Sequence, residues 1–402
     1  MIGPFSIDAV FPAFPLIGAR FGVDASALQQ LISVYLLTYA GMSLFHGAIS
    51  DAIGRKPVVV TGMLVYALAS AGAAMSTSFG MLLTCRGLQG MCAGAGLVVG
   101  RAIVRDTYQG ASAQKLMSRV MMIFGVAPVI APMIGAQLLP LGGWHGIFWV
   151  LTGATALLSL TLFLLLQESH PPQARTPFAP RNLLARYAAF GRDRSFRPLV
   201  IAVSVNYAGL FLYIASAPSI VRELLHLSAQ SFPWLFVPVV VGLVVGASFS
   251  GRLAGRQSVR FTVNLGYASM LLACALHIAL ALLLPKPSVP WSMLPLILHG
   301  VGVQLAFPTL TLLLLDRFPH QRGGASSVQA FASLLLCGLV AGVLSPWLSG
   351  QMLHLALGAS ALTLTGALAW WWYRRSLRYV PGRLSPADGV EIEQQSEIAE
   401  PR

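Results

Sequence analysis

Twelve apolar stretches run through the sequence, and each is long enough to cross a lipid bilayer as a helix. A membrane-spanning helix needs about 20 mostly apolar residues. The stretches lie at residues 1–19, 28–49, 57–77, 79–104, 113–138, 143–167, 197–222, 231–252, 261–284, 289–314, 325–349 and 351–373. Charged residues make up only 10% of the chain, against about 25% in a soluble domain. The chain is therefore predicted to be an all-α polytopic membrane protein with twelve transmembrane helices.

One long interior loop divides these stretches into six plus six. It covers residues 168–196 and is rich in Pro and Arg. Two homologous halves are typical of secondary transporters. We therefore expect an N-terminal six-helix bundle over 1–167, a cytoplasmic central loop over 168–196 and a C-terminal six-helix bundle over 197–373. Residues 374–402, which are polar and acidic near their end, are predicted to be a disordered cytoplasmic tail.

The positions of the basic residues predict the orientation of the chain in the membrane. If both termini are cytoplasmic, Arg20, Arg222 and Lys286 lie outside and Arg86 lies within a span. The rest of the 26 Lys and Arg residues then lie on the cytoplasmic side, as the positive-inside rule requires. The formal net charge of +13 belongs to these loops, so nucleic-acid binding is rejected.

Two charged residues fall inside predicted spans. A charge at the bilayer centre costs about 2.5–3.5 kcal/mol on insertion scales, and intramembrane acids usually serve function. Asp8 is the acid and Arg86 the base, and both lie at similar depth. Burial disfavours the charged form of a carboxyl, so Asp8 is expected to take up and release a proton. We expect Asp8 and Arg86 to pair or to bias each other's protonation; the alternatives are a cytoplasmic-side acid and a base that only caps carbonyls or binds a lipid headgroup.

The stretch at 113–138 carries two prolines on one face, flanked by two glycines. Pro128 and Pro132 are four residues apart, between Gly125 and Gly135. The prolines remove two backbone donors, and the freed carbonyls need partners from neighbouring helices or a water-filled cavity. Such a helix suits an interface between moving halves, and a static kink is the simpler alternative.

A short polar loop separates the second apolar stretch from the third. It contains Gly47, Asp51, Gly54, Arg55 and Lys56. Its glycines permit a tight turn, and Asp51 can face the beginning of the stretch at 325–349, where a helix dipole favours an anion. Arg101 or Arg105 could compete for the same carboxylate. We interpret the loop as a latch between the two halves; the alternative is an orientation signal set by Arg55 and Lys56.

Other polar side chains in the spans are candidates for lining a substrate cavity. These are Gln89, Asn206, Tyr207, Tyr213 and Gln304. The sequence shows no paired carboxylates, metal-ligand cluster or nucleophile–His arrangement, and no G-x-x-x-x-G-K-[ST] phosphate loop. We therefore expect no enzyme activity, no cofactor, no metal and no ATP-driven transport.

Several motifs resemble a known family. The loop G-x-x-x-D-x-x-G-R-K over Gly47–Lys56 resembles the loop signature of the major facilitator superfamily, except that Ala52 stands where a base usually follows the acid. Arg86-Gly87-Leu88-Gln89-Gly90 is similar to its helix-4 motif, and the Gly/Pro face of 113–138 to the antiporter motif of its drug exporters. The segments at 7–15, 144–149, 316–319 and 325–327 resemble the bicyclomycin-resistance (Bcr/CflA) type of drug:proton antiporter.

This resemblance implies a major facilitator fold that exports antibiotics or small toxic metabolites across the bacterial inner membrane. The partners it implies are drug-like or amphipathic small molecules, protons and membrane lipid, and we expect a monomer. Alternating access would come from rocking of the two bundles, with proton coupling at Asp8 and Arg86. A proton-coupled importer or exporter of a small metabolite with the same fold is the first alternative, and a polytopic membrane enzyme or receptor is the second.

Overall fold

A computed structural model describes residues 2–108, 110–254, 256–284, 286–318 and 322–378. Within them every regular element is helical. The first part contains α1 (Ile2–Asp8), η1 (Phe11–Ala13), α2 (Phe14–Phe21), α3 (Ala25–Ser43), α4 (His46–Ile53), α5 (Arg55–Ala74), α6 (Phe79–Gly94), η2 (Ala95–Val99), α7 (Gly100–Thr107) and α8 (Gly110–Leu165). The second part contains η3 (Pro172–Ala174), α9 (Pro180–Arg192), α10 (Phe196–Ala215), η4 (Ser219–Leu224), η5 (Ala229–Ser231), α11 (Pro233–Leu253), α12 (Val259–Leu283), α13 (Pro295–Asp316), α14 (Arg322–Leu339), η7 (Val340–Leu344), α15 (Ser345–Leu348) and α16 (Met352–Arg378).

The predicted membrane spans correspond to these helices. Among the described residues, nine helices are long and apolar enough to cross a membrane, and ten if α3 and α4, bent by 49°, count as one span. The element α8 holds two predicted spans, separated by a non-helical break at Gly142 and Gly143. The predicted first span is the broken segment α1–η1–α2, which contains Pro12 and Pro15, and proline kinks or breaks a helix. The chain is thus a multi-pass, all-α membrane protein, and its helices fit the predicted twelve.

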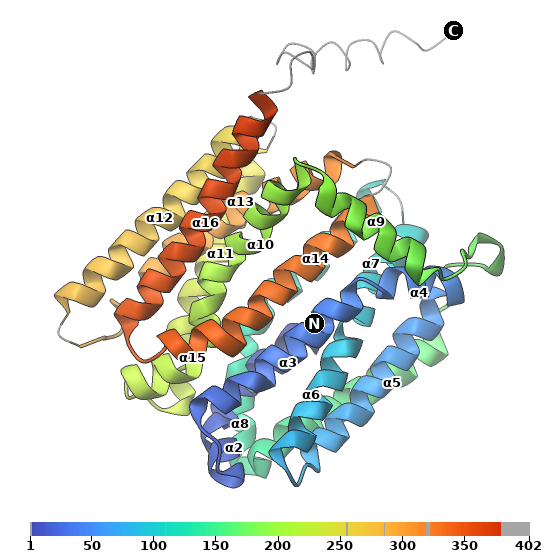
Figure 1. Ribbon diagram of the computed structural model, residues 1–402. Coiled ribbons are helices and arrows are strands. Elements are labelled where there is room, and N and C mark those ends of the chain that lie inside the picture. Colours follow the sequence, from blue (N-terminus) through green and yellow to red (C-terminus); the bar gives the residue numbers. More distant parts are fainter. Residues whose placement is uncertain (1, 109, 255, 285, 319–321, 379–402) are drawn as a thin grey trace.

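The predicted central loop contains a helix of its own. The element α9 lies within 168–196 and crosses one end of the molecule (Figure 1). Its residues Tyr187 and Phe190 are three apart, so they share one face and pack against the rest of the chain. The boundaries of the two predicted bundles stay a prediction. The helix α16 continues to Arg378, so the predicted tail begins later than 374, and residues 379–402 lie outside the described residues.

The helices α3 and α14 lie side by side through the middle of the molecule (Figure 1). The side chain of Ser33 donates a hydrogen bond to the carbonyl oxygen of Gly338 (2.8 Å), and Gln30 donates to that of Gly342 (3.0 Å). Both glycines leave room for this approach, because a Cβ at Gly342 would overlap Ser33. The first and second parts of the chain are therefore in close contact along this seam.

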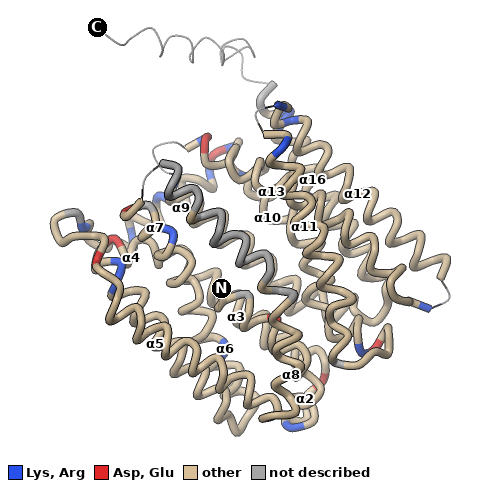
Figure 2. Tube along the Cα trace, turned by 180° about the vertical axis from the view of Figure 1, so that it is seen from behind, with Lys and Arg blue, Asp and Glu red and all other residues tan. Residues whose placement is uncertain are grey.

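Aromatic rings close the molecule toward the end where α2 and α15 lie. The ring of Phe11 in η1 lies 6.4 Å from that of Phe232 and 6.2 Å from that of Phe236, measured between centroids. All three rings are fully or nearly fully buried. Charged residues gather at the two ends of the molecule, and the helical segments between them contain almost none (Figure 2). This arrangement is typical of a protein whose middle faces lipid.

Candidate functional site

Asp8 stands where the first span breaks. It is the last residue of α1, and the chain turns there before η1 begins. Its side chain is buried, with 4% of the residue exposed, and within the described residues it forms no ion pair. Tyr207 on α10, in the second part of the chain, is close enough to interact with Asp8 electrostatically. Asp8 is therefore a buried carboxyl near the seam between the two parts.

Arg86 is fully buried and held by several acceptors. Its Nε donates to the carbonyl oxygen of Leu31 (3.1 Å), and its Nη1 donates to Gln89 Oε1 (2.9 Å) and to Ser6 Oγ (3.2 Å). Its guanidinium carbon also lies 4.6 Å from the ring centroid of Tyr35. Gln89 in turn donates to Ser70 Oγ (2.8 Å). The network links α1, α3, α5 and α6 around one buried positive charge.

Asp8 and Arg86 form no ion pair among the described residues, and the possibility that they bias each other's protonation stays a prediction. Arg86 instead reaches Ser6, two residues before Asp8 on α1. Residues two apart on a helix do not share a face, so Ser6 and Asp8 point to different sides of α1. Asp8 and Arg86 thus lie in the same region of the molecule, but each is surrounded by different residues.

The Gly/Pro-rich helix contacts the segment that carries Asp8. Gly135 in α8 lies so close to α1 that a Cβ there would overlap the carbonyl oxygen of Ala9. Pro132, one turn earlier, is also buried. Gly125 and Pro128 lie on the part of α8 whose side chains are outside the description, so their predicted role stays a prediction.

The predicted polar loop is largely helical, which corrects the expectation of a tight turn. Residues 47–53 belong to α4, which bends away from α3. Only Gly54 breaks the helix, with φ of 108°, a conformation that favours glycine. Gly47 has open space around it, since its nearest neighbour to a Cβ would be Val98 at 4.0 Å.

Within this segment, Asp51 pairs with Arg55 and not with α14. Arg55 Nη1 donates to Asp51 Oδ1 and to Ser50 Oγ (2.6 Å), while its Nε donates to Asp106 Oδ2 (3.1 Å). The predicted competitor Arg105 has a side chain outside the description. The partner that sequence reasoning missed is Asp106, which lies 51 positions away from Arg55.

Glu168 is a second missed residue, and it holds the beginning of α5. Its carboxylate accepts hydrogen bonds from the backbone N–H groups of Arg55 (2.9 Å) and Lys56 (3.3 Å), and from that of His170 (3.0 Å). Partial burial acts in the opposite direction, but these N–H groups and the nearby Arg175 hold the pKa of Glu168 below its ordinary value. Lys56 also places its Nζ 5.6 Å from the ring centroid of Phe163.

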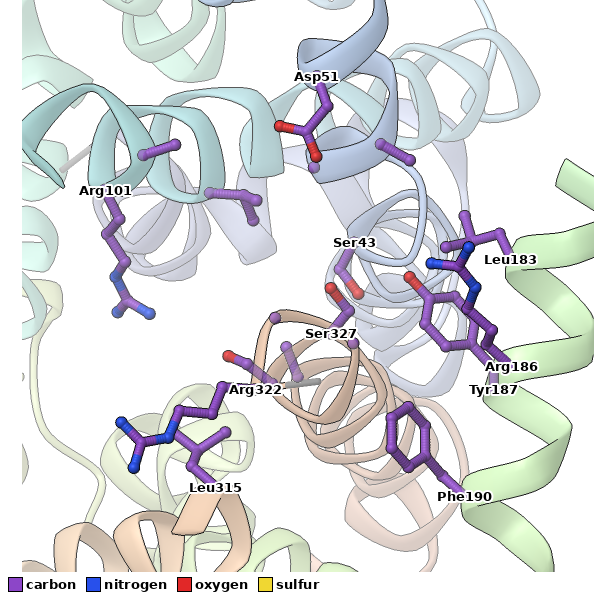
Figure 3. A pocket seen from close by; sticks show the side chains of 18 of the residues that line it. Ser43, Asp51, Arg101, Leu183, Arg186, Tyr187, Phe190, Leu315, Arg322 and Ser327 are labelled. Carbon is purple, nitrogen blue, oxygen red and sulfur yellow. The ribbon is translucent and has the colours of Figure 1, made fainter. Parts of the chain in front are cut away.

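A cavity of about 1030 Å³ opens at the end of the molecule where α9 lies. Its walls come from α3–α4, α7, α9 and the α13–α14 region, and Figure 3 shows Asp51, Arg101, Arg186 and Arg322 around it. The helix α9 connects both sides of the opening: Tyr187 donates to the carbonyl oxygen of Leu44 (2.9 Å), and Phe190 packs against Gly324. The molecule thus has its 1030 Å³ cavity at this end, and a smaller pocket of about 460 Å³ lies at the opposite end, where Phe14 and Glu223 are among the lining residues.

The residues predicted to line a substrate cavity are absent from the lining of this one. Gln89 is held in the Arg86 network, and Tyr213 stacks on His277 with 4.7 Å between ring centroids. Asn206 is buried beside Met270, and Gln304 packs next to Gly246. Tyr207 lies near Asp8. Their role in substrate binding stays a prediction.

Comparison with known proteins gives consistent results. The sequence matches the profile of the Major Facilitator Superfamily over residues 1–340. It is 29% identical over 342 residues to an uncharacterized MFS-type transporter, YdgK, of Bacillus subtilis, covering 85% of each chain. It is 24% identical over 283 residues to a bicyclomycin resistance protein homolog of Haemophilus influenzae (70% and 71% covered). It is 28% identical over 332 residues to multidrug resistance protein D of Escherichia coli (81% of each).

Solved structures share the same fold. A D-xylose–proton symporter superimposes with a TM-score of 0.70 at 15% identity, covering 92% of this chain and 94% of the symporter. A bacterial homolog of the human lysosomal transporter Spinster gives 0.70 at 17% identity, with 96% of both chains covered. At such identities the likeness concerns the fold alone. Together, the sequence profile and the helical architecture show that the chain belongs to the Major Facilitator Superfamily and is a transporter rather than an enzyme.

Proposed function

We propose that this protein exports drug-like small molecules across the bacterial inner membrane in exchange for protons. The observation that carries the proposal is Asp8, a buried carboxyl without an ion-pair partner among the described residues, placed at the break in the first span. The relatives named for multidrug and bicyclomycin resistance support the substrate class. The matching antiporter-type residues Pro132 and Gly135 pack in the same region as Asp8.

The surroundings of Asp8 support a role for this residue in proton coupling. A carboxyl in an apolar site is neutral when protonated and costly when charged. Asp8 is buried and forms no ion pair among the described residues, so in our proposal its charge state depends on which side of the membrane can supply a proton to it. In this proposal, proton binding and release at Asp8 favour different packing of α1 against α8, which it contacts. One proton moving down a potential of 100 mV supplies about 2.3 kcal/mol, which is enough to drive uphill export.

The shape of the molecule fits one state of alternating access. In the proposed orientation, with both termini cytoplasmic, the end where α9 lies faces the cytoplasm. The 1030 Å³ cavity is then open inward, while the Phe11–Phe232–Phe236 cluster closes the outward path. Substrate would enter from the cytoplasm in this state. The Asp51 segment would act as the latch after the two bundles, 1–167 and 197–373, rock to close this cavity. The protein would act as a monomer surrounded by lipid.

The test is drug-induced proton release from everted membrane vesicles that carry the protein. Wild type should release protons on addition of substrate, and Asp8→Asn should abolish that release at equal expression. Glu223→Gln provides the control, because Glu223 is an exposed acid near the opposite end. Antiport that proceeds unimpaired in Asp8→Asn would remove Asp8 from the mechanism.

The direction of transport needs a separate measurement, because importers share this fold. Cells that express the protein should hold less of an exported compound than cells without it. A higher intracellular level would instead indicate a proton-coupled importer and would contradict the proposed export.

A further inference from the structure

The cavity at the end where α9 lies has more positive than negative side chains in its wall. Four arginines line it, from α5, α7, α9 and the start of α14: Arg55, Arg101, Arg186 and Arg322. Two acids line it, Asp51 and Asp316. Arg55 contacts Asp51 and also Asp106, and Arg322 contacts Asp316 at 2.8 Å. Even with Asp106 counted, basic groups outnumber acidic ones.

These arginines are arranged around the space and not along one wall. Figure 3 shows Arg101 and Arg322 reaching into the cavity from two different helices, with Arg186 near Tyr187 on α9. The charged side chains of the wall carry a net positive charge, and net charge in a cleft with low-dielectric walls attracts ions of the opposite sign. A guanidinium also matches carboxylate, sulfonate or phosphate oxygens with two parallel hydrogen bonds.

The remainder of the wall is apolar and aromatic. Leu97, Leu312 and Leu334 line the cavity together with Tyr39 and Phe190. Ligand pockets of roughly 300–1,000 Å³ hold drug-sized molecules, so this cavity has room for one. A cavity wall that combines positive charge with apolar surface fits a ligand that has a hydrophobic body and an acidic group.

We propose that the preferred substrates are amphipathic organic anions, bound by an apolar body against the leucine and aromatic wall and by an acidic group near Arg101, Arg186 and Arg322. This inference rests on the proposed export, for which it names the substrate class. It also has a consequence for energetics: exchange of one proton inward for one monovalent anion outward moves two charges across the membrane. Exchange of a proton for a monovalent cation would move none.

Binding and transport of two matched probes test the proposal. Dansylglycine carries a carboxylate, and a dansylamide with a trimethylammonium group carries the same fluorophore with a positive charge. Binding is measured by fluorescence with the purified full chain in lipid nanodiscs, and transport in energised everted vesicles. We expect dansylglycine to bind at least tenfold more tightly than the cation, and its transport to increase with the membrane potential.

Charge variants connect this preference to the cavity. Arg186→Gln and Arg101→Gln should each weaken binding of dansylglycine about fivefold or more, and Arg186→Glu should narrow or reverse the preference. Arg252→Gln is the matched control, because Arg252 is exposed on α11 and does not line the cavity. Size-exclusion chromatography confirms that each variant is folded, and the exposed Arg186 keeps the test usable if Arg101→Gln does not fold.

The outcomes separate the two proposals. If dansylglycine binds more tightly than the cationic probe but neither probe is transported, the result would support the substrate class and contradict the proposed export. If either probe is transported and both bind equally well, the substrate class would be overturned and the proposed export would stand. The same conclusion would follow if Arg186→Glu left the preference for dansylglycine unchanged.

Discussion

Gly135 of α8 lies directly against the backbone of Ala9, the residue that follows Asp8. A Cβ at position 135 would overlap the carbonyl oxygen of Ala9, so only glycine permits this approach. The contact joins the Gly/Pro-rich helix to the break in the first span. Movement of α8 must therefore change the surroundings of Asp8.

Gly135→Ala should impair export by disturbing this contact. Overpacking a close backbone contact costs about 1–3 kcal/mol, and the displaced α1 would move Asp8. We expect export to fall at least tenfold and the thermal unfolding temperature to drop, measured by drug accumulation and by differential scanning fluorimetry. Gly153→Ala, in the second span of α8, is the control, because nothing lies within 4 Å of a Cβ there. Equal effects of both substitutions would show that the Ala9 contact has no special role.

Arg86→Lys should impair export although it keeps the positive charge. Lysine is a point charge on a flexible chain and cannot reproduce the planar fork of donors that reaches Leu31, Ser6 and Gln89. Hydrogen bonds to charged groups are worth about 1.5–3 kcal/mol each. We expect a drop in both transport rate and unfolding temperature, whereas Arg20→Lys, at an exposed site, should change neither. A fully active Arg86→Lys would mean that charge alone is sufficient.

The main features of the fold could be predicted from the sequence, because lipid imposes a strong pattern. Apolar stretches of about 20 residues are unambiguous when so few charges exist. Asp8 and Arg86 were found for the same reason, since each stands alone in an apolar span. Gly54 was singled out as a glycine of the polar loop that permits a tight turn, and the structure gives it a positive φ of 108°.

Long-range partners could not be predicted in this way. Asp106 lies 51 positions and Glu168 lies 113 positions from Arg55, so no local pattern connects them. The helix α9 was missed because it lies within the Pro- and Arg-rich stretch 168–196 and, at 13 residues, is too short to give the pattern of about 20 apolar residues that marks a span. The small number of acids was one signal in the sequence that could have pointed to these partners. The chain has only 13 acidic residues, so each acid near the end of a span is a candidate partner for a base.

Asp51→Asn should separate the role of the acid from that of the neighbouring bases. The Asp51 side chain is 44% exposed in its pair with Arg55, and such pairs contribute about 0–1 kcal/mol. Arg55 also keeps Asp106. Membrane insertion and unfolding temperature should therefore stay close to wild type, whereas a latch role predicts an approximately tenfold loss of transport. Normal transport would leave only the orientation role of Arg55 and Lys56.

Glu168→Gln should destabilise the protein at neutral pH and have little effect in acid. The carboxylate satisfies the first N–H groups of α5, and losing a cap of this kind costs about 0.5–2 kcal/mol. Because the pKa of Glu168 is lowered in the folded protein, its stabilisation is complete above its unfolded-state pKa and is lost as the pH falls through the folded-state pKa. We expect a lower unfolding temperature for Glu168→Gln than for wild type at neutral pH, and we expect this difference to disappear as the pH falls through the lowered folded-state pKa and the wild-type carboxylate is protonated. Glu223→Gln, at an exposed position, should have the same unfolding temperature as wild type at both neutral and acid pH. If the difference in unfolding temperature between Glu168→Gln and wild type stays the same in acid, Glu168 stabilises α5 through packing and not through the charge of its carboxylate.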